Sequence, residues 1–424
     1  MPKEIAAADL PRLLKPGMTV FLQGSSGEPT PLLEAVRAEA GASDGVHYVG
    51  CLIPGINRQD PASWHPNARA TGFFVGADQR ASFAQRRFSF LPLHYSGIYA
   101  YLASLPPVDL ALLQVSPPDA AGNCSLGVSL DFQPAVLDKA RAVVAEVNAQ
   151  MPAPPSAPTI PWDRLSHVVR TDRPLMHFES GGLSDTIRTL GERVATLVED
   201  GDVIQIGIGK APAAILNQLH GKRDLGLQGG MITDEVLALV ESGALTNARK
   251  SIDRGKLVCG SAIGTEKVYR WPGLLTEVLY KPVSYTHEVR VVSQLDNFVS
   301  INSVLEVDLT GQANAEMLAG RQVSGTGGLV DFVRSARMAK NGRSILALTA
   351  TAAGGKASRI VPQLEGGSVA SALRADVDYV VTEFGAARLK DKSVDERAEA
   401  LIGVAAPEFR AGLAEDWERL RRSA

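Results

Sequence analysis

Two glycine-rich turns are the segments of this sequence best suited to hold an anionic ligand. Gly207 and Gly209 lie between an expected strand, 203–206, and an expected helix that opens near Pro212. Bare backbone amides at such a turn can receive an anion, although the three-glycine dinucleotide fingerprint is incomplete. The second turn, 324–328, has three glycines in five residues, which lets the backbone approach a ligand closely. A purely structural turn is the alternative at both places.

Of the seven histidines, His287 has the strongest potential for chemistry. It lies just before an apolar strand pattern, and an imidazole that titrates near neutral pH can take or give a proton. The histidines do not have the spacing of metal ligands, so no metal site is predicted. The three cysteines are scattered among apolar or small residues, which predicts buried thiols. The sequence shows no nucleophile elbow, a Gly-x-Ser-x-Gly turn between a strand and the helix that follows it, so a hydrolase triad has no support.

The elements that must position these residues occur in a repeated order. Residues 15–36 and 200–219 each contain a turn, a short apolar strand, a glycine-rich turn and a helix that opens near a proline. Two later apolar segments, 108–115 and 377–382, are expected strands and extend the similarity. This pattern predicts two related α/β halves.

The boundary between the halves is placed before the helix pattern 183–197, which gives residues 1–180 and 181–424 as the two domains. Within the second domain, residues 299–309 alternate between apolar and polar side chains. This alternation predicts one strand with a mainly apolar face and a polar face that could line a cleft.

Composition excludes several classes of function. A formal net charge of −3 argues against a general nucleic-acid-binding surface. The sequence contains no run of about 20 apolar residues, which argues against a membrane span. The first residues lack the apolar stretch of an export signal. A cytoplasmic globular protein with a sizeable core is therefore predicted.

Taken together, the motifs resemble the acetyl-CoA hydrolase/transferase family, which includes 4-hydroxybutyrate and acetate CoA-transferases. The matching segments follow the family's order over nearly the whole chain: Gln114–Asp119, Cys124–Gly127, Gln205–Gly209, Ser300–Ser303, Glu306–Leu309, Ser324–Gly328, Ser358–Pro362 and Val381–Gly385. The resemblance implies two CoA-transferase-type open α/β domains with the acyl-CoA site in the cleft between them. It also implies coenzyme A as substrate or bound ligand, a small carboxylic acid as partner, and a homodimer.

The resemblance further implies roles for individual residues. Gly327 or Gly328 should supply a backbone oxyanion donor, and Glu383 matches a family position near the site. Candidate contacts of CoA are Gly207, Gly209, Ser324, Gly325, Arg359 and Lys392. The two cations match basic family positions that could meet CoA phosphates, although a solvated surface role fits either one equally well.

One departure from the family pattern bears directly on the reaction. In the family, a glutamate within a segment similar to Gly-Leu-His-Ser-Glu-Met-Ile attacks the thioester. Here Met231 and Ile232 keep the register, and Gly230 takes the place of that glutamate. Glycine cannot be a nucleophile. His287 stands where the family usually has an asparagine that helps to stabilise the oxyanion, and an imidazole can also donate a hydrogen bond or accept a proton.

The preferred hypothesis is an acyl-CoA enzyme that uses water in place of a glutamyl intermediate. It would hydrolyse a CoA thioester, or a carbon–carbon bond in a CoA-linked substrate, since ring-opening hydrolases share this fold. Gly230 is expected to leave room for water or for a bulkier acyl group. One alternative is a CoA-transferase with a relocated glutamate; Glu235 is considered for this role, although a solvated or N-terminal helix acid is favoured there. Glu383 and, less strongly, Glu288 are candidates for acid–base work. The other alternative is a catalytically silent CoA-binding protein. The acyl group is not determined by the sequence.

Overall fold

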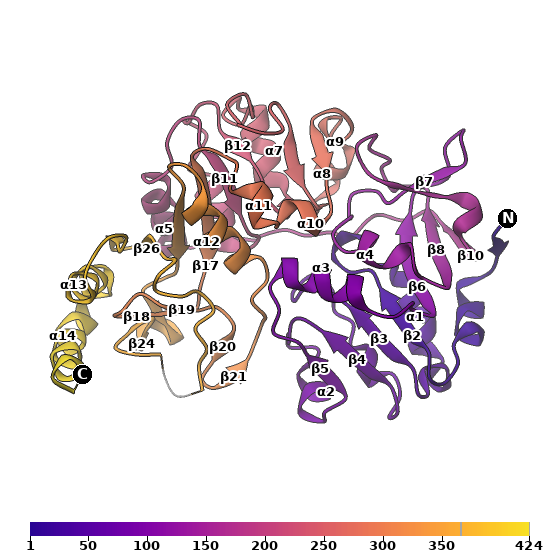
Figure 1. The fold of residues 1–424 in the computed structure, drawn as a ribbon, viewed down its shortest axis with the longest axis horizontal. Helices are drawn as coiled ribbons and strands as arrows, with labels where there is room; N and C mark the ends of the chain where they lie inside the picture. The colour runs from indigo at the N-terminus through magenta and orange to yellow at the C-terminus, as the bar shows by residue number, and fades with distance from the viewer. Residues whose placement is uncertain (365–366, 424) are drawn as a thin grey trace.

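The computed structural model describes residues 1–364 and 367–423. Two α/β halves lie side by side along the longest axis, with the N-terminus at one end and the C-terminus at the other (Figure 1). Each half is built on its own sheet, as the repeated sequence pattern predicts. Within the described residues, no helix combines the length and the apolar character needed to cross a membrane.

The N-terminal sheet has eight strands, and all of them pair in parallel. Its central strands are mainly apolar and almost entirely buried because helices and loops cover both faces, which is typical of parallel sheets. In spatial order the strands are β1 (Lys3–Glu4), β10 (His167–Thr171), β8 (Ala142–Asn148), β6 (Leu110–Val115), β2 (Thr19–Leu22), β3 (His47–Gly50), β4 (Arg69–Gly72) and β5 (Phe88–Phe90).

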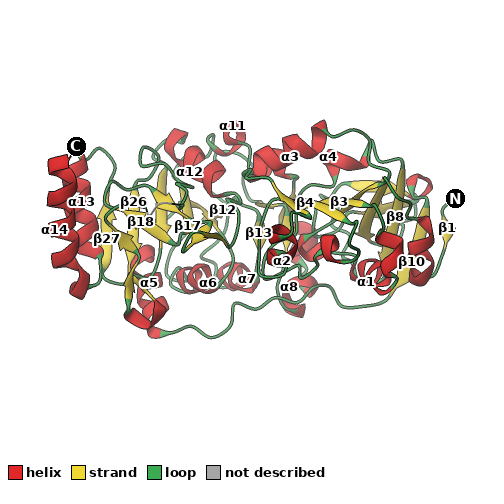
Figure 2. Ribbon diagram, turned by 90° about the horizontal axis from the view of Figure 1, so that it is seen from below, coloured by secondary structure: helices red, strands yellow, loops and turns green. Residues whose placement is uncertain are grey.

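The helices of this half are short, and α3 is the one that reaches the other half. The helices are α1 (Thr30–Ala38), α2 (Arg80–Ala84), α3 (Tyr95–Ser104) and α4 (Pro134–Leu137). A small antiparallel pair, β7 (Asn123–Ser125) with β9 (Thr159–Pro161), stands beside the sheet. In Figure 2, α3 and α4 lie on one face of the sheet and α1 lies on the other.

The C-terminal sheet has six strands, and its last strand, β27, runs antiparallel to its neighbour. In spatial order the strands are β12 (Gly226–Leu227), β11 (Val203–Ile206), β17 (Phe298–Ser303), β22 (Arg343–Ala347), β26 (Tyr379–Thr382) and β27 (Gly385–Arg388). Short strands outside this sheet are β13 (Met231–Ile232), β14 (Leu257–Cys259), β15 (Ser261–Ala262), β16 (Val278–Tyr280), β18 (Glu306–Asp308), β19 (Ala313–Asn314), β20 (Met317–Leu318), β21 (Arg321–Gln322), β23 (Thr351–Ala352), β24 (Ala357–Ser358) and β25 (Ile360–Val361).

Helices cover both faces of the C-terminal sheet. In Figure 2, α11 and α12 lie on one side and α5, α6 and α7 on the other, while α13 and α14 close the outer end. Their bounds are α5 (Asp185–Ala195), α6 (Lys210–Leu216), α7 (Asp234–Glu241), α8 (Glu266–Arg270), α9 (Gly273–Thr276), α10 (Val283–Thr286), α11 (Val289–Val292), α12 (Leu329–Met338), α13 (Val394–Val404) and α14 (Pro407–Ser423).

Most of the expected strands and helices are present, and one expectation is wrong. The apolar segments 108–115 and 377–382 contain β6 and β26, and the helix pattern 183–197 contains α5. The single strand expected over 299–309 is instead two strands, because the chain leaves the sheet after β17 and β18 pairs with β19 and β25. The alternation continued across the break because both strands bury apolar side chains.

The two halves are not copies of each other in strand order. In the N-terminal sheet β6 is the direct neighbour of β2, whereas β17 and β22 separate β26 from β11. The first sheet ends at residue 171 and the second begins at residue 203. The proposed boundary near residue 180 lies between them and stays a prediction.

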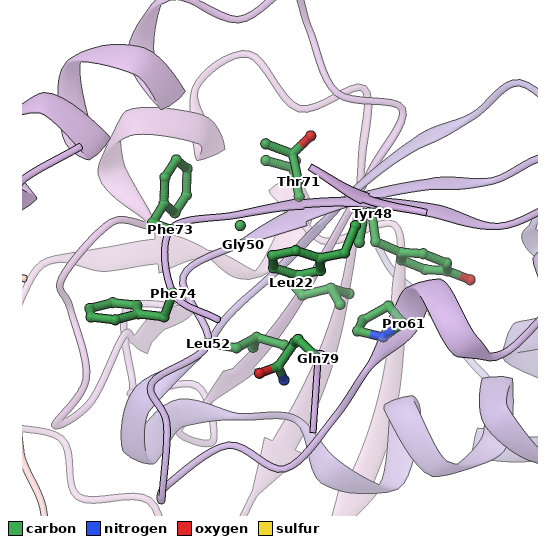
Figure 3. Close-up of a pocket in the computed structure, with 13 residues that line it drawn as sticks. Leu22, Tyr48, Gly50, Leu52, Pro61, Thr71, Phe73, Phe74 and Gln79 are labelled. Carbon is green, nitrogen blue, oxygen red and sulfur yellow. The ribbon is translucent and has the colours of Figure 1, made fainter. Parts of the chain in front are cut away.

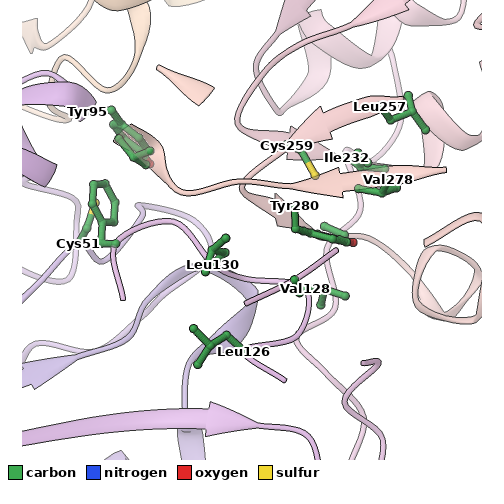
Figure 4. Packing of buried hydrophobic residues seen from close by; sticks show 14 of the residues in the cluster. Cys51, Tyr95, Leu126, Val128, Leu130, Ile232, Leu257, Cys259, Val278 and Tyr280 are labelled. Carbon is green, nitrogen blue, oxygen red and sulfur yellow. The ribbon is translucent and has the colours of Figure 1, made fainter. Parts of the chain in front are cut away.

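One hydrophobic core runs through the junction of the two halves. Figure 4 shows Cys51, Tyr95 and Leu130 of the N-terminal half packed near Cys259 and Tyr280 of the C-terminal half. This continuous apolar contact fixes how the two sheets face each other. All three cysteines are free and buried, as the sequence predicts.

Candidate active site

The carboxyl ends of the C-terminal strands gather several residues that the sequence singles out. β11 leads directly into the Gly207–Gly209 turn, β12 ends shortly before Gly230, and β26 leads directly into Glu383. Ligands of open α/β sheets bind outside the carboxyl ends of the strands. This edge is therefore the physically expected place for a site.

The carboxyl ends of the N-terminal strands face the same junction. The Ser25 hydroxyl, which follows β2, donates to the Ser261 hydroxyl of the other half at 3.2 Å. The Val75 amide, which follows β4, donates to the Ser324 carbonyl oxygen at 3.2 Å. The edges where ligands normally bind thus meet each other across the two halves.

The glycine-rich turn 324–328 lies at this junction, and close packing leaves no room for a side chain at Gly325. A Cβ on Gly325 would lie 2.1 Å from the Phe73 carbonyl oxygen, so no larger residue fits there without movement. The Gly327 carbonyl oxygen accepts a hydrogen bond of 3.0 Å from the Tyr95 amide at the start of α3. The turn therefore joins the two halves in addition to any role toward a ligand.

A carboxylate of α12 strengthens the same contact. The Asp331 side chain accepts hydrogen bonds from the Ser96 amide at 3.0 Å and from the Ser96 hydroxyl at 2.6 Å. The His94 Nε2 atom lies 3.7 Å from the Asp331 Oδ1 atom. Asp331 thereby satisfies a backbone donor in the first turn of α3, which belongs to the other half.

His287 is buried where these elements converge, directly after α10. Its side chain is only 3% exposed. The imidazole stacks on the Tyr95 ring at a centroid distance of 4.7 Å and contacts the Phe332 ring at 4.5 Å. A residue of α3 and a residue of α12 thus hold the ring from both halves.

The imidazole lies between the two glycines that the sequence analysis connects with catalysis. A Cβ on Gly230 would lie 3.3 Å from His287 Cε1 and 3.5 Å from Nε2. A Cβ on Gly328 would lie 2.7 Å from the same Nε2 atom. The expectation that Gly230 leaves open room needs correction, because the His287 ring takes the position next to it.

Burial decides the charge of this histidine. Desolvation, followed by the influence of nearby His94, lowers the pKa of His287 to about 3. The ring is therefore neutral at physiological pH. Its Nδ1 atom is 2.9 Å from the Thr286 hydroxyl oxygen, which can act as donor or acceptor. A neutral imidazole with such a low pKa is suited to donate one hydrogen bond and poorly suited to accept a proton from water.

The loop that carries Gly230 is held from two sides. The Gly230 carbonyl oxygen accepts hydrogen bonds from the amides of Gly260 at 3.0 Å and Ser261 at 2.9 Å. The buried Lys250 ammonium donates to the Leu227 carbonyl oxygen at 3.0 Å. Burial lowers the pKa of Lys250 to about 8. These contacts fix the backbone of the loop that carries Gly230.

A polar cluster lies beside the same loop. The Asn302 amide donates to the Gln205 Oε1 atom at 3.0 Å and to the Ser300 hydroxyl oxygen at 2.8 Å. A Cβ on Gly229 would lie 3.6 Å from the Gln205 side chain. This cluster lies on the polar face of β17, in agreement with the expected polar face of that strand. Its amides and hydroxyl can orient a polar ligand group.

The acidic candidates are each engaged in local hydrogen bonds. Glu383 accepts from the Ala350 amide at 2.8 Å, and Glu288 accepts from the Arg290 amide at 3.1 Å at the start of α11. Glu235 lies in the first turn of α7, where it accepts from the Ser180 hydroxyl at 2.6 Å and from a neighbouring threonine. All three carboxylates are thus oriented by their surroundings, and none of these bonds links them to His287.

The expected CoA contacts are spread over different places. Gly207 is exposed, and a Cβ on it or on Gly209 would meet nothing within 4 Å. The Ser324 backbone is occupied, because its amide donates to the Glu316 carbonyl oxygen at 3.2 Å and its own carbonyl accepts from the N-terminal half. Arg359 is half-buried, between β24 and β25.

Lys392 lies elsewhere in the C-terminal half. It directly precedes the N-cap of α13, the helix at the outer end of the molecule (Figure 1). Its carbonyl oxygen accepts a hydrogen bond of 3.2 Å from Arg397. This contact is local to the start of α13, and it does not connect Lys392 with the turn Gly207–Gly209 or with the turn 324–328.

Two cavities lie outside the contact between Gly230 and His287. One, of about 10 Å³, lies at the carboxyl ends of β2, β3 and β4 and is lined mainly by apolar side chains, including Phe73 and Phe74 (Figure 3). The other, of about 620 Å³, is lined by residues 178–182, the start of α7 with Glu235, and Lys267. Neither is lined by Gly230 or His287.

Sequence reasoning missed the residues that surround His287 and Gly230. Tyr95, Phe332 and Ser261 come from three distant parts of the chain, and nothing in their local sequence marks them as site residues. Among the described residues, no group of three or more His, Cys, Asp or Glu side chains is arranged to hold a metal ion.

Family models identify the protein class that this fold and junction define. Residues 2–169 match the acetyl-CoA hydrolase/transferase N-terminal domain, and residues 264–417 match the C-terminal domain of the same family. The chain is 36% identical over 394 residues to a 4-hydroxybutyrate coenzyme A transferase of Clostridium kluyveri, covering 93% of this chain and 92% of the relative. The chain therefore belongs to the acetyl-CoA hydrolase/transferase family.

Solved structures agree with this assignment. RipA from Yersinia pestis superimposes with a TM-score of 0.91 at 30% identity, covering 99% of this chain and 98% of that one. A 4-hydroxybutyrate CoA-transferase from Porphyromonas gingivalis gives a TM-score of 0.81 at 32% identity, with coverage of 100% and 98%. An acetyl-CoA hydrolase of Neurospora crassa is 23% identical over 366 residues, covering 76% of this chain and 68% of the relative. The family thus includes both transferases and hydrolases, and the chain is an enzyme of this type.

Proposed function

We propose that this enzyme hydrolyses a CoA-linked substrate by direct attack of water, without a covalent glutamyl-CoA intermediate. The bond that breaks is either the thioester or a carbon–carbon bond of a β-keto or cyclic acyl-CoA. Hydrolysis of the thioester releases CoA and a carboxylic acid. Cleavage of a β-keto acyl-CoA releases a carboxylic acid and a shortened acyl-CoA, and cleavage of a ring leaves the new carboxyl group on the opened acyl-CoA. The sequence argument for this proposal is that Gly230 stands where the resemblance to the family places the attacking glutamate.

One observation carries the proposal: the imidazole of His287 lies against Gly230, with Cε1 3.3 Å from the position of a Cβ. The side chain of a nucleophile at this position would therefore begin in tight contact with a buried ring, which would have to move slightly. Because that ring is neutral, it suits a hydrogen-bond donor more than a nucleophile or a proton acceptor. This favours the oxyanion-donor role for His287 over the role of base.

The proposed step for a thioester balances as follows. The oxygen of water forms a bond to the carbonyl carbon, the carbonyl oxygen becomes an oxyanion, and the carbon–sulfur bond then breaks. One proton of water leaves with the sulfur as the CoA thiol. His287, with the hydrogen on Nε2 and Thr286 donating to Nδ1, would donate to the oxyanion together with the backbone at Gly327 or Gly328.

For a β-keto acyl-CoA the same donors would act on the keto group. Water would add to the keto carbon, and the bond to the adjacent methylene carbon would break. That carbon would take up the proton, so the products would be a carboxylic acid and a shortened acyl-CoA. Glu383, oriented by the Ala350 amide, is the acid that we assign to proton handling in either case.

For CoA binding we favour the open turn Gly207–Gly209 and the half-buried Arg359. The amides of the turn are unobstructed, and a guanidinium binds phosphate well. Ser324 and Gly325 would shape the junction without contacting CoA, since the other half occupies their backbone. Lys392 is the weakest of the expected contacts because its interactions are local to α13.

A second candidate function is CoA transfer through a relocated glutamate. Several relatives are CoA-transferases, and the Glu235 carboxylate lines the cavity of about 620 Å³. In that mechanism Glu235 would attack the thioester, expel the CoA thiolate and form an acyl anhydride. The returning CoA thiolate would attack the glutamyl carbonyl carbon of the anhydride, release the acyl group as a carboxylate and leave a glutamyl-CoA thioester.

Trapping distinguishes these functions. The enzyme is incubated with a panel of straight-chain, β-keto and cyclic acyl-CoA compounds, treated with borohydride or hydroxylamine, and digested for mass spectrometry. Direct hydrolysis predicts free acid or a shortened acyl-CoA and no modified glutamate. A labelled glutamate overturns the proposal, and its position identifies the relocated nucleophile. Tight CoA binding without turnover of any compound would instead indicate a catalytically silent protein.

A further inference from the structure

Asp131 is a buried carboxylate that the proposed mechanism does not use. A single residue, Ser261, connects it to Gly230. Asp131 belongs to the N-terminal half and is 6% exposed. Its Oδ2 atom accepts a hydrogen bond of 2.5 Å from the Ser261 hydroxyl of the C-terminal half. A Cβ on Gly260 would lie 2.2 Å from its Oδ1 atom. Asp131 therefore fits closely against Gly260 and Ser261.

These two residues are the ones that hold Gly230. Both backbone amides, of Gly260 and of Ser261, donate to the Gly230 carbonyl oxygen. The chain of contacts runs from the Asp131 carboxylate to the Ser261 side chain, and from the Ser261 amide to Gly230. A carboxylate of one half is thus connected to the loop of the other half through a single residue.

Ser25, which contacts Ser261 from the N-terminal half, has a strained backbone conformation. Ser25 donates its hydroxyl to the Ser261 hydroxyl oxygen at 3.2 Å, and it has a positive φ of 56°, which L-residues rarely adopt. The Asn57 side chain holds that conformation by accepting from the Ser25 amide at 2.9 Å. A conformation that costs energy is thereby maintained at the point where Ser25 meets Ser261.

Among the described residues, the groups that act on Asp131 include no cation to balance its charge. The titratable groups that face it are the thiols of Cys51 and Cys259 and the phenol of Tyr95. Burial raises the pKa of Asp131 to about 6, against the opposing effect of the Ser261 and Ser25 hydroxyls. Carrying a buried charge without a cation costs stability. Stability alone therefore does not explain why this position carries a carboxylate.

We infer that Asp131 is a positioning residue, which fixes Ser261 across the junction and, through Ser261, the backbone of Gly230 beside His287. This inference rests on the proposed function, because it assigns Gly230 and His287 to the reaction. Asp131 is not placed in contact with the substrate. Its role is to set the geometry of the loop against which the substrate would react.

The pH dependence follows from the direction of the pKa shift. The folded state holds the Asp131 proton up to about pH 6, whereas the unfolded chain releases it in the ordinary carboxyl range. The folded state therefore binds more protons in this interval, and stability falls as the pH rises to about 6. The charged carboxylate orders Ser261, so activity should rise over the same interval.

The test uses the full chain with Asp131→Asn and Ser261→Ala, and Asp378→Asn as matched control. Asp378 is also a buried acid that contacts a serine, Ser344, but it lies at the amino end of β26. Thermal unfolding, kcat and KM are measured across pH 5 to 8, and hydrogen exchange is followed in peptides that cover residues 226–235 and 257–264. The acyl-CoA found by the trapping panel is the substrate.

For Asp131→Asn we expect kcat to fall by about tenfold to a hundredfold with KM nearly unchanged. The rise in activity near pH 6 should disappear, and the stability should no longer fall in that interval. Ser261→Ala removes a donor that favours the carboxylate, so the rise should move to higher pH. Both variants should exchange faster in the two loop peptides, while Asp378→Asn should not.

Unchanged kcat, pH profile and loop exchange in folded Asp131→Asn would overturn the inference. If Asp131→Asn does not fold, Ser261→Ala decides by the same measurements. If the wild-type enzyme turns over none of the acyl-CoA compounds, the proposed function fails, and the exchange measurements still decide whether Asp131 holds the Gly230 loop.

Discussion

The two glycine-rich turns look alike in the sequence and differ in the folded protein. The turn at Gly207–Gly209 is open, since a Cβ on either glycine would meet nothing within 4 Å. The turn 324–328 is crowded, since a Cβ on Gly325 would lie 2.1 Å from a backbone oxygen of the other half. Glycine serves different purposes in the two places: backbone freedom in one and close approach of two domains in the other. An open turn can receive a ligand, whereas a crowded turn positions its neighbours.

Gly230 is intermediate between these extremes, and its one close neighbour is His287. A Cβ there would lie 3.3 Å from the imidazole, which is tight contact without severe overlap. The position accepts a side chain only if the ring moves. The two positions at which the sequence is expected to depart from the family pattern are therefore in contact, although 57 positions separate them in the sequence.

The largest expected effect is at the crowded turn. Gly325→Ala should cost about 3 kcal/mol of unfolding free energy, because the new methyl group overlaps the Phe73 carbonyl oxygen and backbone must shift. Urea unfolding measures the loss. Gly207→Ala is the matched control and should stay within about 0.5 kcal/mol of the wild type. Equal losses in the two variants would contradict the distinction between the turns.

The contact between Gly230 and His287 predicts a gain of function. Gly230→Glu combined with His287→Asn should raise exchange of labelled acetate into acetyl-CoA by about a hundredfold, the scale of a well-placed catalytic group. Gly230→Glu alone should gain little, because the ring obstructs the new side chain. His287→Asn alone is the control without a nucleophile. Equal exchange in the single and double glutamate variants would show that the ring does not obstruct this position.

Loss of the contact between Asp331 of α12 and the first turn of α3 should have a smaller effect. Asp331→Ala should lose about 2 kcal/mol of stability, because it leaves the Ser96 amide and hydroxyl of α3 without their acceptor. Thermal unfolding measures the loss, and hydrogen exchange should increase in α3 more than in α5. An unchanged α3 would indicate that the junction does not depend on this carboxylate.

The smallest expected effect is the pH response of His287. Since its pKa is about 3, kcat should change by less than about twofold through ionisation of this residue between pH 6.5 and 8. The sign for stability is opposite to that for Asp131. The unfolded chain binds the proton more readily, so the contribution of His287 is lost as the pH falls from about 6.5 to about 3. A titration of the imidazole by NMR with a midpoint near 6.5 would contradict its buried, neutral state.

Much of the fold could be predicted because local patterns carry it. The parallel strands are short apolar runs that turn or polar loop residues follow, so the sequence alone locates β2, β6, β11 and β26. The strand expected over 299–309 failed for a physical reason: alternation records which face is buried, and it does not record to which sheet a segment belongs.

The site was predictable only in part. The similarity of motifs to the family identifies Gly230 and His287, but it does not show that the two residues are in contact. Their contact, and the stacking of His287 between Tyr95 and Phe332, depend on how the two halves dock. Asp131 and Ser261 carry no local signal of their roles, because those roles arise from contacts across the junction.

The sequence by itself determined the family, the two α/β halves, the buried thiols and the turns that contain the candidate glycines. These follow from short-range patterns of residue type, which act wherever the segment lies. Only the tertiary structure decided which glycines are open and which are crowded, which charge His287 carries, and what occupies the space beside Gly230. Those properties depend on burial and on distances between segments that are remote in the chain, and packing of the two halves sets both.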